Sequence, residues 1–402
     1  MKTRTLLLAA SAAAVMVAGT AQAREIKIGF IAPKSGGAAN LGDQLEKGAR
    51  LYIKLHAKDL GGDAIKLIVR DSKRPGGPIA KAAAQELITR EKVEMIAGII
   101  FSPNAMSIAP LANAAKVPVV IMNAGTSWIT KLSPYMARVS FTMWQSGYIM
   151  GEHASTKMGC KTAVSGYTNY PPGKDSVAAF KRGFESTGGK LLDAIPMGGP
   201  RSVPDFTPFF QRAKDKKPNC LYVFVPAGNH AAAVAKTFDA LGMRKAGIKL
   251  IGPGDITQDT QLQKMGTTAV GVITAHHYYA DLPTPTNQAF VKAWKATYGA
   301  KSTPDFVGVQ SYDGMAAIFH VIKAAKGKRI TAGAAIAALK GWKYNSPRGP
   351  IMIDPKTRDI VQNVYISTVR MGKGGRLTQE IQRTFTGVND KCKELKIGKC
   401  GK

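Results

Sequence analysis

Two predicted strands are followed by short loops that carry hydroxyl groups, FSPN after the first and NAGTSW after the second. Ser102 and Thr126 supply the hydroxyls, and Ala124 and Gly125 are small enough to let a ligand approach the backbone. Ser102 stands where a helix is predicted to begin, and the unpaired N–H groups there favour a carboxylate or another anion. The alternative is that both hydroxyls only cap turns. The loops alone leave both interpretations open.

A glycine-rich stretch, KSGGAANLGDQ, follows the first predicted strand, IKIGFIA, and raises the question of a phosphate site. A phosphate loop of the G-x-x-x-x-G-K-[ST] type has its lysine and hydroxyl after the last glycine. Here Lys34 and Ser35 come before Gly36 and Gly37, and no G-x-G-x-x-G is present. We therefore expect no nucleotide site.

Signatures of hydrolases and zinc enzymes are missing as well. The sequence has neither a G-x-S-x-G nucleophile elbow nor an H-E-x-x-H zinc helix. His276 and His277 form the only histidine pair, and adjacent residues of a strand point to opposite faces. We therefore expect a structural or cleft-lining role for this pair. The sequence predicts no catalysis, no cofactor and no metal site.

These loops lie between strands and helices that alternate along the chain. Strands are predicted over 26–32, 65–72, 93–100 and 117–123, with helices over 41–58, 78–92 and 104–115. The pattern restarts after residue 140, and further helices are predicted over 287–298, 309–326 and 331–340, before a strand-rich end. Runs of valine and isoleucine with little alternation suit strands buried on both faces. The sequence therefore predicts an α/β fold of two doubly wound lobes.

In open α/β sheets, ligands bind outside the carboxyl ends of the strands. The loops at those ends are 33–41, 101–104, 123–128, 168–174, 226–230 and 253–257. Two such lobes commonly enclose a cleft. We therefore expect the binding site between the lobes.

Residues 1–23 have the pattern of a signal peptide. Lys2 and Arg4 precede an apolar run, LLLAASAAAVMVAG, and the tripeptide AQA, which ends at Ala23, has the form of a cleavage site. The run is too short to span a bilayer comfortably. We expect export, with cleavage after Ala23.

Basic residues outnumber acidic ones, 56 against 26, and give a formal charge of +30. Such a charge can attract nucleic acid, an anionic membrane or an acidic ligand. Lysine and arginine are scattered, without a dense run or an interleaved aromatic stripe. We therefore expect no nucleic-acid partner.

Four cysteines in an exported chain favour disulfides, with three pairings open in principle. Cys392 and Cys400 are close together in the polar tail, which suggests a local loop. Cys160 and Cys220 each directly precede a predicted strand. If those strands are neighbours in a parallel sheet, the two sulfurs start at the same edge and can meet.

The ordered set of segments resembles a known family. The matching segments are IKIGFIAPKSGGAANLGDQLEKGARLYI, AGIIFSPNAMSIAPLANAAKVPVVIMNAGTSW, KDSVAAFKRGFESTGG, PDFTPFFQRAK, VGVQSYDGMAAIFHVIKAAK and GPIMIDPKTRDIVQNVYI. In kind and order they resemble the type I periplasmic solute-binding proteins of ABC importers, in the branched-chain amino-acid (Leu/Ile/Val) group. The resemblance implies lobe 1 from 24–140 plus 280–360, lobe 2 from 141–279 plus 361–402, and hinge crossings near 139–142, 277–281 and 358–362.

The resemblance also implies the roles of site residues. Ser102 and Thr126 would hold a ligand carboxylate, with help from the backbone of Ala124 and Gly125. Further ligand contacts are expected at Leu41, Tyr170, Pro226, Asp255 and Tyr278.

Several of these positions depart from the pattern of the amino-acid binders. Leu41 and Pro226 stand where aromatic residues are expected, and the acidic position holds Gly254, with Asp255 one residue later. A secure partner for an α-amino group is therefore missing. Tyr170, Trp128, Trp144 and Tyr278 can supply aromatic walls, although core packing is the simpler role for each. Lys174 can help attract an anion.

The resemblance implies a monomeric periplasmic receptor that closes on a small solute and presents it to an ABC permease. We expect a branched-chain or other hydrophobic amino acid as ligand, with an aromatic or aliphatic carboxylate as the alternative. A sensory subunit is a second alternative to transport.

Overall fold

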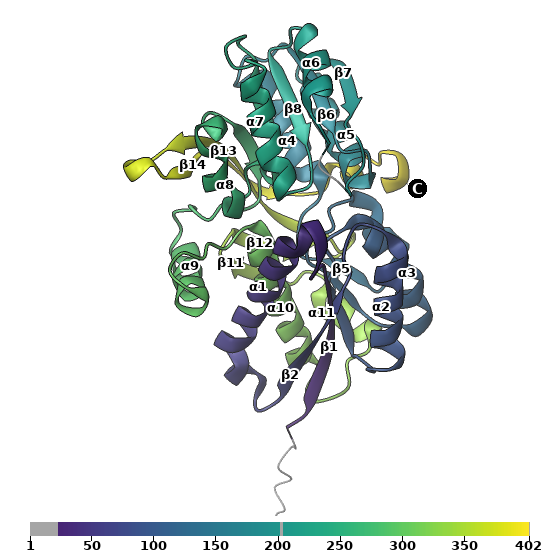
Figure 1. Ribbon diagram of the computed structural model, residues 1–402. Coiled ribbons are helices and arrows are strands. Elements are labelled where there is room, and N and C mark those ends of the chain that lie inside the picture. Colours follow the sequence, from purple (N-terminus) through teal and green to yellow (C-terminus); the bar gives the residue numbers. More distant parts are fainter. Residues whose placement is uncertain (1–22, 202–203, 402) are drawn as a thin grey trace, which may run out of the picture.

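Two β-sheets, one parallel and one mixed, each with helices on both faces, form the two lobes of the molecule (Figure 1). The computed structural model describes residues 23–201 and 204–401 of the 402-residue chain. The expected signal peptide, apart from Ala23, lies outside the described residues. Within the described ranges, none of the helices combines the length and apolar character needed to cross a membrane.

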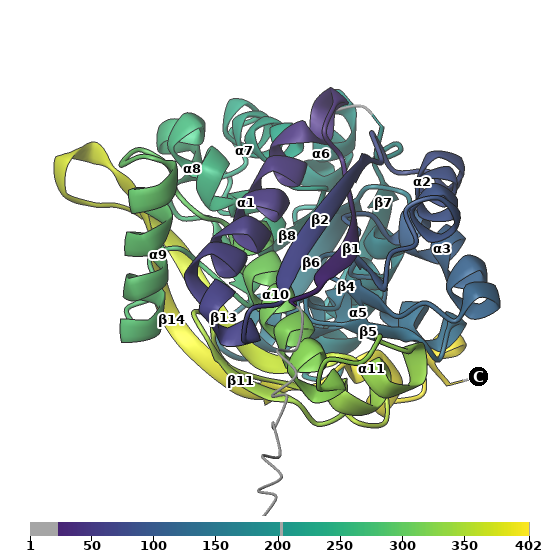
Figure 2. The same ribbon diagram turned by 90° about the horizontal axis from the view of Figure 1, so that it is seen from below.

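Lobe 1 is built on a parallel sheet with the strand order β2-β1-β3-β4-β5. The strands are β1 (Glu25–Ala32), β2 (Ala64–Asp71), β3 (Met95–Gly98), β4 (Val119–Ile121) and β5 (Met136–Arg138). The helices are α1 (Ala39–His56), α2 (Gly77–Thr89), α3 (Ser102–Ala115), α9 (Pro285–Tyr298), α10 (Phe306–Ala325) and α11 (Ala332–Leu339). Figure 2 shows α1 and α10 on one face of the sheet and α2 and α3 on the other. Because both faces are covered, the strands are apolar along most of their length, as the sequence predicts.

Lobe 2 has a sheet with the order β7-β6-β8-β9-β10-β13, in which β6 to β10 are parallel and β13 is antiparallel to β10. The strands are β6 (Thr162–Tyr167), β7 (Lys190–Pro196), β8 (Cys220–Phe224), β9 (Lys249–Pro253), β10 (Ile273–His276) and β13 (Ile360–Met371). The helices are α4 (Met143–Thr156), α5 (Pro171–Glu185), α6 (Thr207–Asp215), α7 (Asn229–Ala240) and α8 (Asp259–Met265). This arrangement confirms the predicted fold class.

The chain passes between the lobes three times. The first passage joins β5 to α4, and the second joins β10 to α9. The third is β13 itself, where Ile360 pairs with Ile353 of lobe 1 and Tyr365 pairs with His276 of lobe 2. The partner strands are β12 (Gly349–Ile353), which pairs with β11 (Lys343–Ser346), and β14 (Leu377–Val388), which runs antiparallel along β13. One strand is therefore shared by both lobes.

A buried ion pair connects the first and third passages. Arg348 and Asp313 are both fully buried, with 2.7 Å between Nε and Oδ2. The Arg348 guanidinium also donates to the Ser140 carbonyl and to Gln362 Oε1, each at 2.7 Å, and to the Val139 carbonyl. Arg348 thus binds the first and third passages at the same time.

Both disulfides form the expected pairs, Cys160–Cys220 and Cys392–Cys400. Cys160 lies two residues before the start of β6, and Cys220 begins β8, its neighbour in the sheet. The Cys392–Cys400 pair closes the C-terminal segment that contains α12 (Lys391–Glu394).

The side chains of His276 and His277 do not point to opposite faces, as the sequence had led us to expect. The ring centroids of His276 and His277 lie 4.2 Å apart, so the two rings do not occupy opposite faces. The reason is that β10 ends at His276, and the alternation of side chains ends with it. Burial lowers the pKa of His276 to about 3, so its ring is neutral at physiological pH.

Some elements begin elsewhere than predicted. Helix α3 starts at Ser102 and α10 at Phe306, both earlier than expected, and β4 is shorter. Strands β5, β11 and β14 were not predicted. The first two have three and four residues, too few for an alternation of apolar and polar side chains to be recognised.

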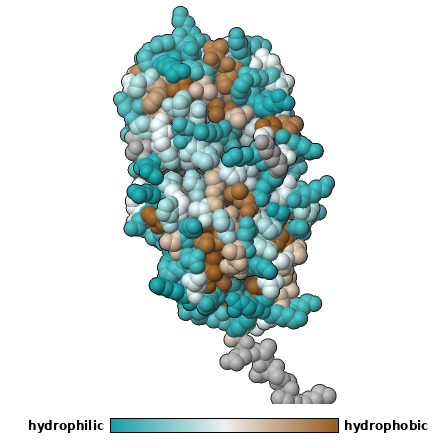
Figure 3. Space-filling model, turned by 90° about the vertical axis from the view of Figure 1, so that its right-hand side faces the viewer, coloured by the Kyte–Doolittle hydropathy of each residue, from teal (hydrophilic) through white to brown (hydrophobic). Residues whose placement is uncertain are grey.

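Seen from the side of α2, α3 and α5, the surface is mainly hydrophilic, with hydrophobic patches separated from one another (Figure 3).

Candidate functional site

A cavity lies between the lobes, at the carboxyl ends of the strands. Lobe 1 contributes the loops after β1, β3 and β4 and the start of α10, and lobe 2 contributes the loops after β6, β8 and β9. The lining residues are Leu41, Ile100, Phe101, Ser102, Asn123, Gly125, Phe141, Met143, Tyr170, Pro172, Phe224, Pro226, Ala227, Asp255, Phe306 and Val307. This cavity therefore lies at the strand ends, where ligands bind in open α/β sheets.

Two hydroxyl groups of lobe 1 lie at or next to this cavity: Ser102 is part of its lining, and Thr126 directly follows the lining residue Gly125. Ser102, the first residue of α3, is buried, and its Oγ accepts the N–H of Thr126 at 3.1 Å. Because Ser102 acts as acceptor in that bond, its own hydroxyl hydrogen remains available to an anion. The Thr126 hydroxyl is buried without a hydrogen-bond partner among the described residues. The arrangement suits a carboxylate more than a simple turn cap, since a buried hydroxyl without a partner costs free energy.

Aromatic rings form most of the remaining wall. Phe101, Phe141 and Phe306 line it from lobe 1 and the first passage, and Tyr170 and Phe224 line it from lobe 2. The Phe141 and Phe306 rings meet edge to face at 6.3 Å, and the Tyr170 and Phe224 rings stack at 6.1 Å. A flat apolar ligand in the cavity would contact aromatic rings from both lobes.

Asp255 is the acidic group of the cavity. It is only 6% exposed, and its Oδ2 has no hydrogen-bond partner within the described part of the chain. Burial raises the pKa of Asp255 to about 7. Tyr170, whose own pKa is raised by burial and then by Asp255, lies near this carboxyl group. The carboxyl group can therefore donate or accept a hydrogen bond near neutral pH.

The glycine-rich loop after β1 is held by protein groups. The Lys34 N–H donates to Asp71 Oδ1 at 2.7 Å, and the Ser35 hydroxyl donates to Asp71 Oδ2 at 2.6 Å. A Cβ atom on Gly42 would lie 1.6 Å from the Pro33 carbonyl oxygen, so only glycine fits. This close packing fixes the first turn of α1, which carries Leu41 into the cavity wall.

Most of the expected site residues come together. The cavity lining includes Leu41, Ser102, Gly125, Tyr170, Pro226 and Asp255. Ala124 and Thr126 flank Gly125 in the same loop but are not among the residues that line the cavity. Tyr278 lies elsewhere: it is fully buried, and its hydroxyl donates to Asn287 Oδ1 at 3.0 Å.

Two other expected aromatic residues pack outside the cavity. Trp144 is buried and Trp128 is partly buried in a small cluster with both cysteines of the C-terminal disulfide. Of the rings that do line it, Tyr170 was expected. Phe224 was missed because it ends a buried strand, where its sequence is typical of core. Phe141 lies within the expected first passage, which was an available signal.

Comparisons with known proteins agree with this geometry. Residues 25–376 match the periplasmic binding protein family. A Leu/Ile/Val-binding protein homologue of Brucella melitensis biotype 1 is 36% identical over 385 residues, which cover 96% of this chain and 98% of that protein.

Two solved structures of solute-binding proteins of ABC transporters are similar over nearly the whole chain. One, from Rhodopseudomonas palustris BisB5 in complex with 3,4-dihydroxybenzoic acid, has 43% identity and a TM-score of 0.86, covering 92% of this chain and 99% of that one. The other, from Rhodopseudomonas palustris HaA2 in complex with p-hydroxybenzoic acid, has 36% identity and a TM-score of 0.87, covering 91% and 98%. The chain belongs to the periplasmic binding protein family, as a type I solute-binding protein of ABC transporters.

Proposed function

We propose that this protein captures an aromatic carboxylate in the periplasm and delivers it to an ABC permease without altering it. The ligand carboxylate binds at Ser102, Thr126 and the Gly125 backbone, and the ring lies between the aromatic walls. We further propose that the protein acts as a monomer and reaches the periplasm after cleavage behind Ala23.

The aromatic wall carries this proposal. Phe141, Phe306, Tyr170 and Phe224 all line the cavity, so aromatic rings reach it from both lobes. Two relatives of similar structure are complexes with hydroxylated benzoic acids. Asp255 supports the same ligand class, because a buried carboxyl group can bind a ring hydroxyl.

Closure of the lobes is expected to retain the ligand. The Ser127 N–H of lobe 1 donates to Asp175 Oδ2 of lobe 2 at 2.8 Å. The Thr260 hydroxyl of lobe 2 donates to Asp305 Oδ2 of lobe 1 at 3.2 Å. A ligand that contacts both lobes favours the closed state by its difference in affinity for the two states. The closed surface is the one we propose the permease recognises.

A branched-chain amino acid is the second candidate. Asp255 would then be ionised and pair with the ligand ammonium group, and the relative named for Leu/Ile/Val binding supports this choice. The raised pKa of Asp255 weakens the idea for the ligand-free protein, since burial favours the uncharged carboxyl group.

Isothermal titration calorimetry separates these candidates. We expect binding of benzoate, 4-hydroxybenzoate or 3,4-dihydroxybenzoate, and none of leucine, isoleucine or valine. At 100 times the dissociation constant, a true ligand adds about 2.7 kcal/mol to the free energy of unfolding. Binding of the amino acids alone would refute the proposal of an aromatic ligand. Conversion of the bound ligand to another compound would refute the proposal that the protein leaves it unaltered.

Variants test the carboxylate site. Ser102→Ala removes a donor to the ligand and is expected to weaken binding by about tenfold or more, as for a hydrogen bond to a charged group. Ser107→Ala is the matched control, because Ser107 lies on the same helix and its hydroxyl donates to the Gly77 and Asn104 carbonyls outside the cavity. Equal affinities of the two variants would contradict the proposed role of Ser102. Loss of aromatic-acid uptake in a deletion strain would favour transport over a sensory role.

A further inference from the structure

One buried arginine donates hydrogen bonds to the loop after β4, residues 123–128, which we call the ligand loop. Arg138 ends β5 and is completely buried. Its Nη1 donates to the carbonyl oxygens of Ala124 at 2.9 Å and Thr126 at 2.7 Å, and its Nη2 donates to that of Ser127 at 2.9 Å. Three carbonyls of the loop therefore bind a single guanidinium.

This arrangement sets the direction of the loop N–H groups. In a trans peptide, the N–H points opposite to the carbonyl of the same unit. Since the Ala124 carbonyl faces Arg138, the Gly125 N–H is directed away from Arg138, and Gly125 lines the cavity. The Thr126 carbonyl likewise turns the Ser127 N–H toward Asp175 Oδ2. Arg138 thus orients the backbone that we propose meets the ligand.

Arg138 is in turn fixed by Asp359. The Arg138 Nε lies 2.8 Å from Asp359 Oδ1, and both side chains are almost completely buried. Burial alone would raise the pKa of Asp359, but Arg138 and Lys393 outweigh that effect and hold the pKa below its ordinary value. The carboxyl group is therefore ionised and shared by two cations.

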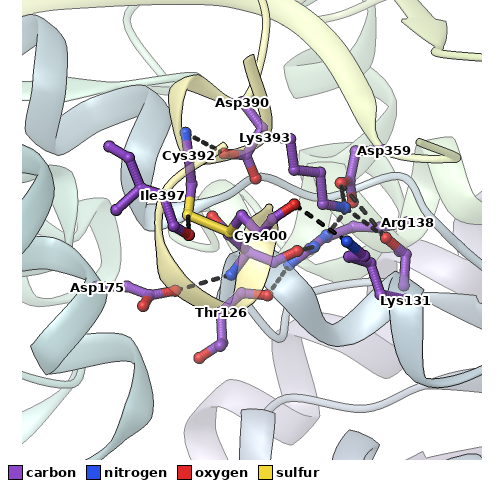
Figure 4. The surroundings of a disulfide bond; sticks show 12 residues. Thr126, Lys131, Arg138, Asp175, Asp359, Asp390, Cys392, Lys393, Ile397 and Cys400 are labelled. Carbon is purple, nitrogen blue, oxygen red and sulfur yellow. Dashed lines mark hydrogen bonds and ion pairs between the residues drawn. A yellow bond between two sulfur atoms is a disulfide. The ribbon is translucent and has the colours of Figure 1, made fainter. Parts of the chain in front are cut away.

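The second cation comes from the C-terminal tail, residues 390–400. Lys393 of α12 pairs with Asp359 and donates to the Thr130 hydroxyl at 2.6 Å (Figure 4). Lys131 donates to the Cys400 carbonyl at 3.1 Å. The tail therefore contacts the segment that directly follows the ligand loop.

The disulfide is what gives this tail a fixed shape. A one-turn helix such as α12 is not stable by itself, because nucleation of a helix is unfavourable. Cys392 lies in that turn and is bonded to Cys400, with 5.8 Å between the Cα atoms. Figure 4 shows the disulfide beside Lys393, Asp359 and Arg138.

We infer that the disulfide-closed tail is a brace for the ligand loop, acting through Lys393, Asp359 and Arg138 as positioning residues. The inference rests on the proposed function only in the choice of ligand. When the disulfide is absent, Lys393 loses its fixed position, Arg138 is held by one partner fewer, and the loop must be ordered by the ligand at a cost in affinity.

Two double variants test the brace. The tail variant carries Cys392→Ser and Cys400→Ser. The sheet variant carries Cys160→Ser and Cys220→Ser and is the matched control, because that disulfide lies at the amino ends of β6 and β8, away from the cavity.

Affinity for 4-hydroxybenzoate is the first readout. We expect the tail variant to bind about tenfold more weakly, the effect of ordering one or two backbone residues. The sheet variant is expected to stay within about twofold of the wild type, as for a distant, independent site. Equal affinities of the two variants would overturn the inference.

Amide hydrogen exchange is the second readout and needs no ligand. The amides of residues 123–128 that exchange by local opening should exchange faster in the tail variant and at the wild-type rate in the sheet variant. If the wild type does not bind 4-hydroxybenzoate, the proposed ligand is wrong, and exchange alone decides the brace. Unchanged exchange at 123–128 would overturn it.

Lys393→Met provides a variant that keeps the disulfide. It removes the charge but retains much of the side-chain length, and it should accelerate the same amides. If the tail variant fails to fold, this variant decides the question in the same way. Exchange at the wild-type rate in Lys393→Met would show that the tail does not act through Lys393.

Discussion

Replacement of Arg348 by methionine should destabilise the hinge strongly. Arg348 and Asp313 are fully buried, and Arg348 donates to Gln362 and to the carbonyls of Val139 and Ser140. Arg348→Met leaves a buried carboxylate without its cation and two carbonyls without this donor. Breaking a buried pair in this way costs about 3–5 kcal/mol.

The penalty should depend on pH. Burial raises the pKa of Asp313 to about 6 even beside Arg348, and removal of that cation raises it further. A group with a raised pKa in the folded state contributes stability that is lost as the pH rises through that value. The difference between the pKa of Asp313 in the folded and in the unfolded state is larger in the variant than in the wild type. The penalty of Arg348→Met is therefore expected to be larger at pH 8 than at pH 5.

Urea unfolding at both pH values measures this effect, with Arg370→Met as the matched control. Arg370 pairs with Glu380 at 2.8 Å, but both side chains are more than half exposed. Such a pair contributes less than about 1 kcal/mol. A loss from Arg348→Met no larger than that from Arg370→Met, or one equal at pH 5 and pH 8, would refute the reasoning.

Three other measurements test the disulfides, the cavity carboxyl group and one glycine. The sheet variant should lose about 4 kcal/mol of the free energy of unfolding and the tail variant about 2.5 kcal/mol, because the disulfides close loops of 60 and 8 residues. Urea unfolding measures both losses, and a larger loss in the tail variant would contradict this. The pKa of Asp255, raised by burial from 3.8 to about 7, makes its contribution present at pH 5 and lost by pH 8, so Asp255→Asn should gain about 3 kcal/mol on the wild type over that interval. An unchanged difference would exclude the buried, uncharged state. Gly42→Ala should lower the melting temperature, because its Cβ would clash with the Pro33 carbonyl, whereas Gly37→Ala, with nothing within 4 Å, should not.

The sequence predicts the fold because its signals are local. Unbroken apolar strands such as β3 and β4 indicate a sheet covered on both faces. The loops that follow them contain Ser102 and Gly125, and both line the cavity. The two disulfides follow from the positions of the cysteines relative to strands and tail.

The aromatic wall and the brace could not be predicted in the same way. Phe141, Phe224 and Phe306 come from distant segments, and each one by itself has the character of a core residue. Arg138 and Asp359 are separated by 221 positions, and arginine is normally exposed, so no local pattern marks the pair. The start of α10 carried a further missed signal, because Asp305 caps it by accepting hydrogen bonds from the N–H groups of Val307 and Gly308.

The shared strand β13 has a consequence for the biogenesis of the protein. During synthesis, β6 to β10 emerge first, but the outer edge of β10 has no partner until β13 (Ile360–Met371) has been made. Lobe 1 meanwhile awaits α10 and β12, which also come late in the chain. An open strand edge invites pairing with other chains. Neither lobe can therefore complete its sheet until nearly the whole chain is available for folding.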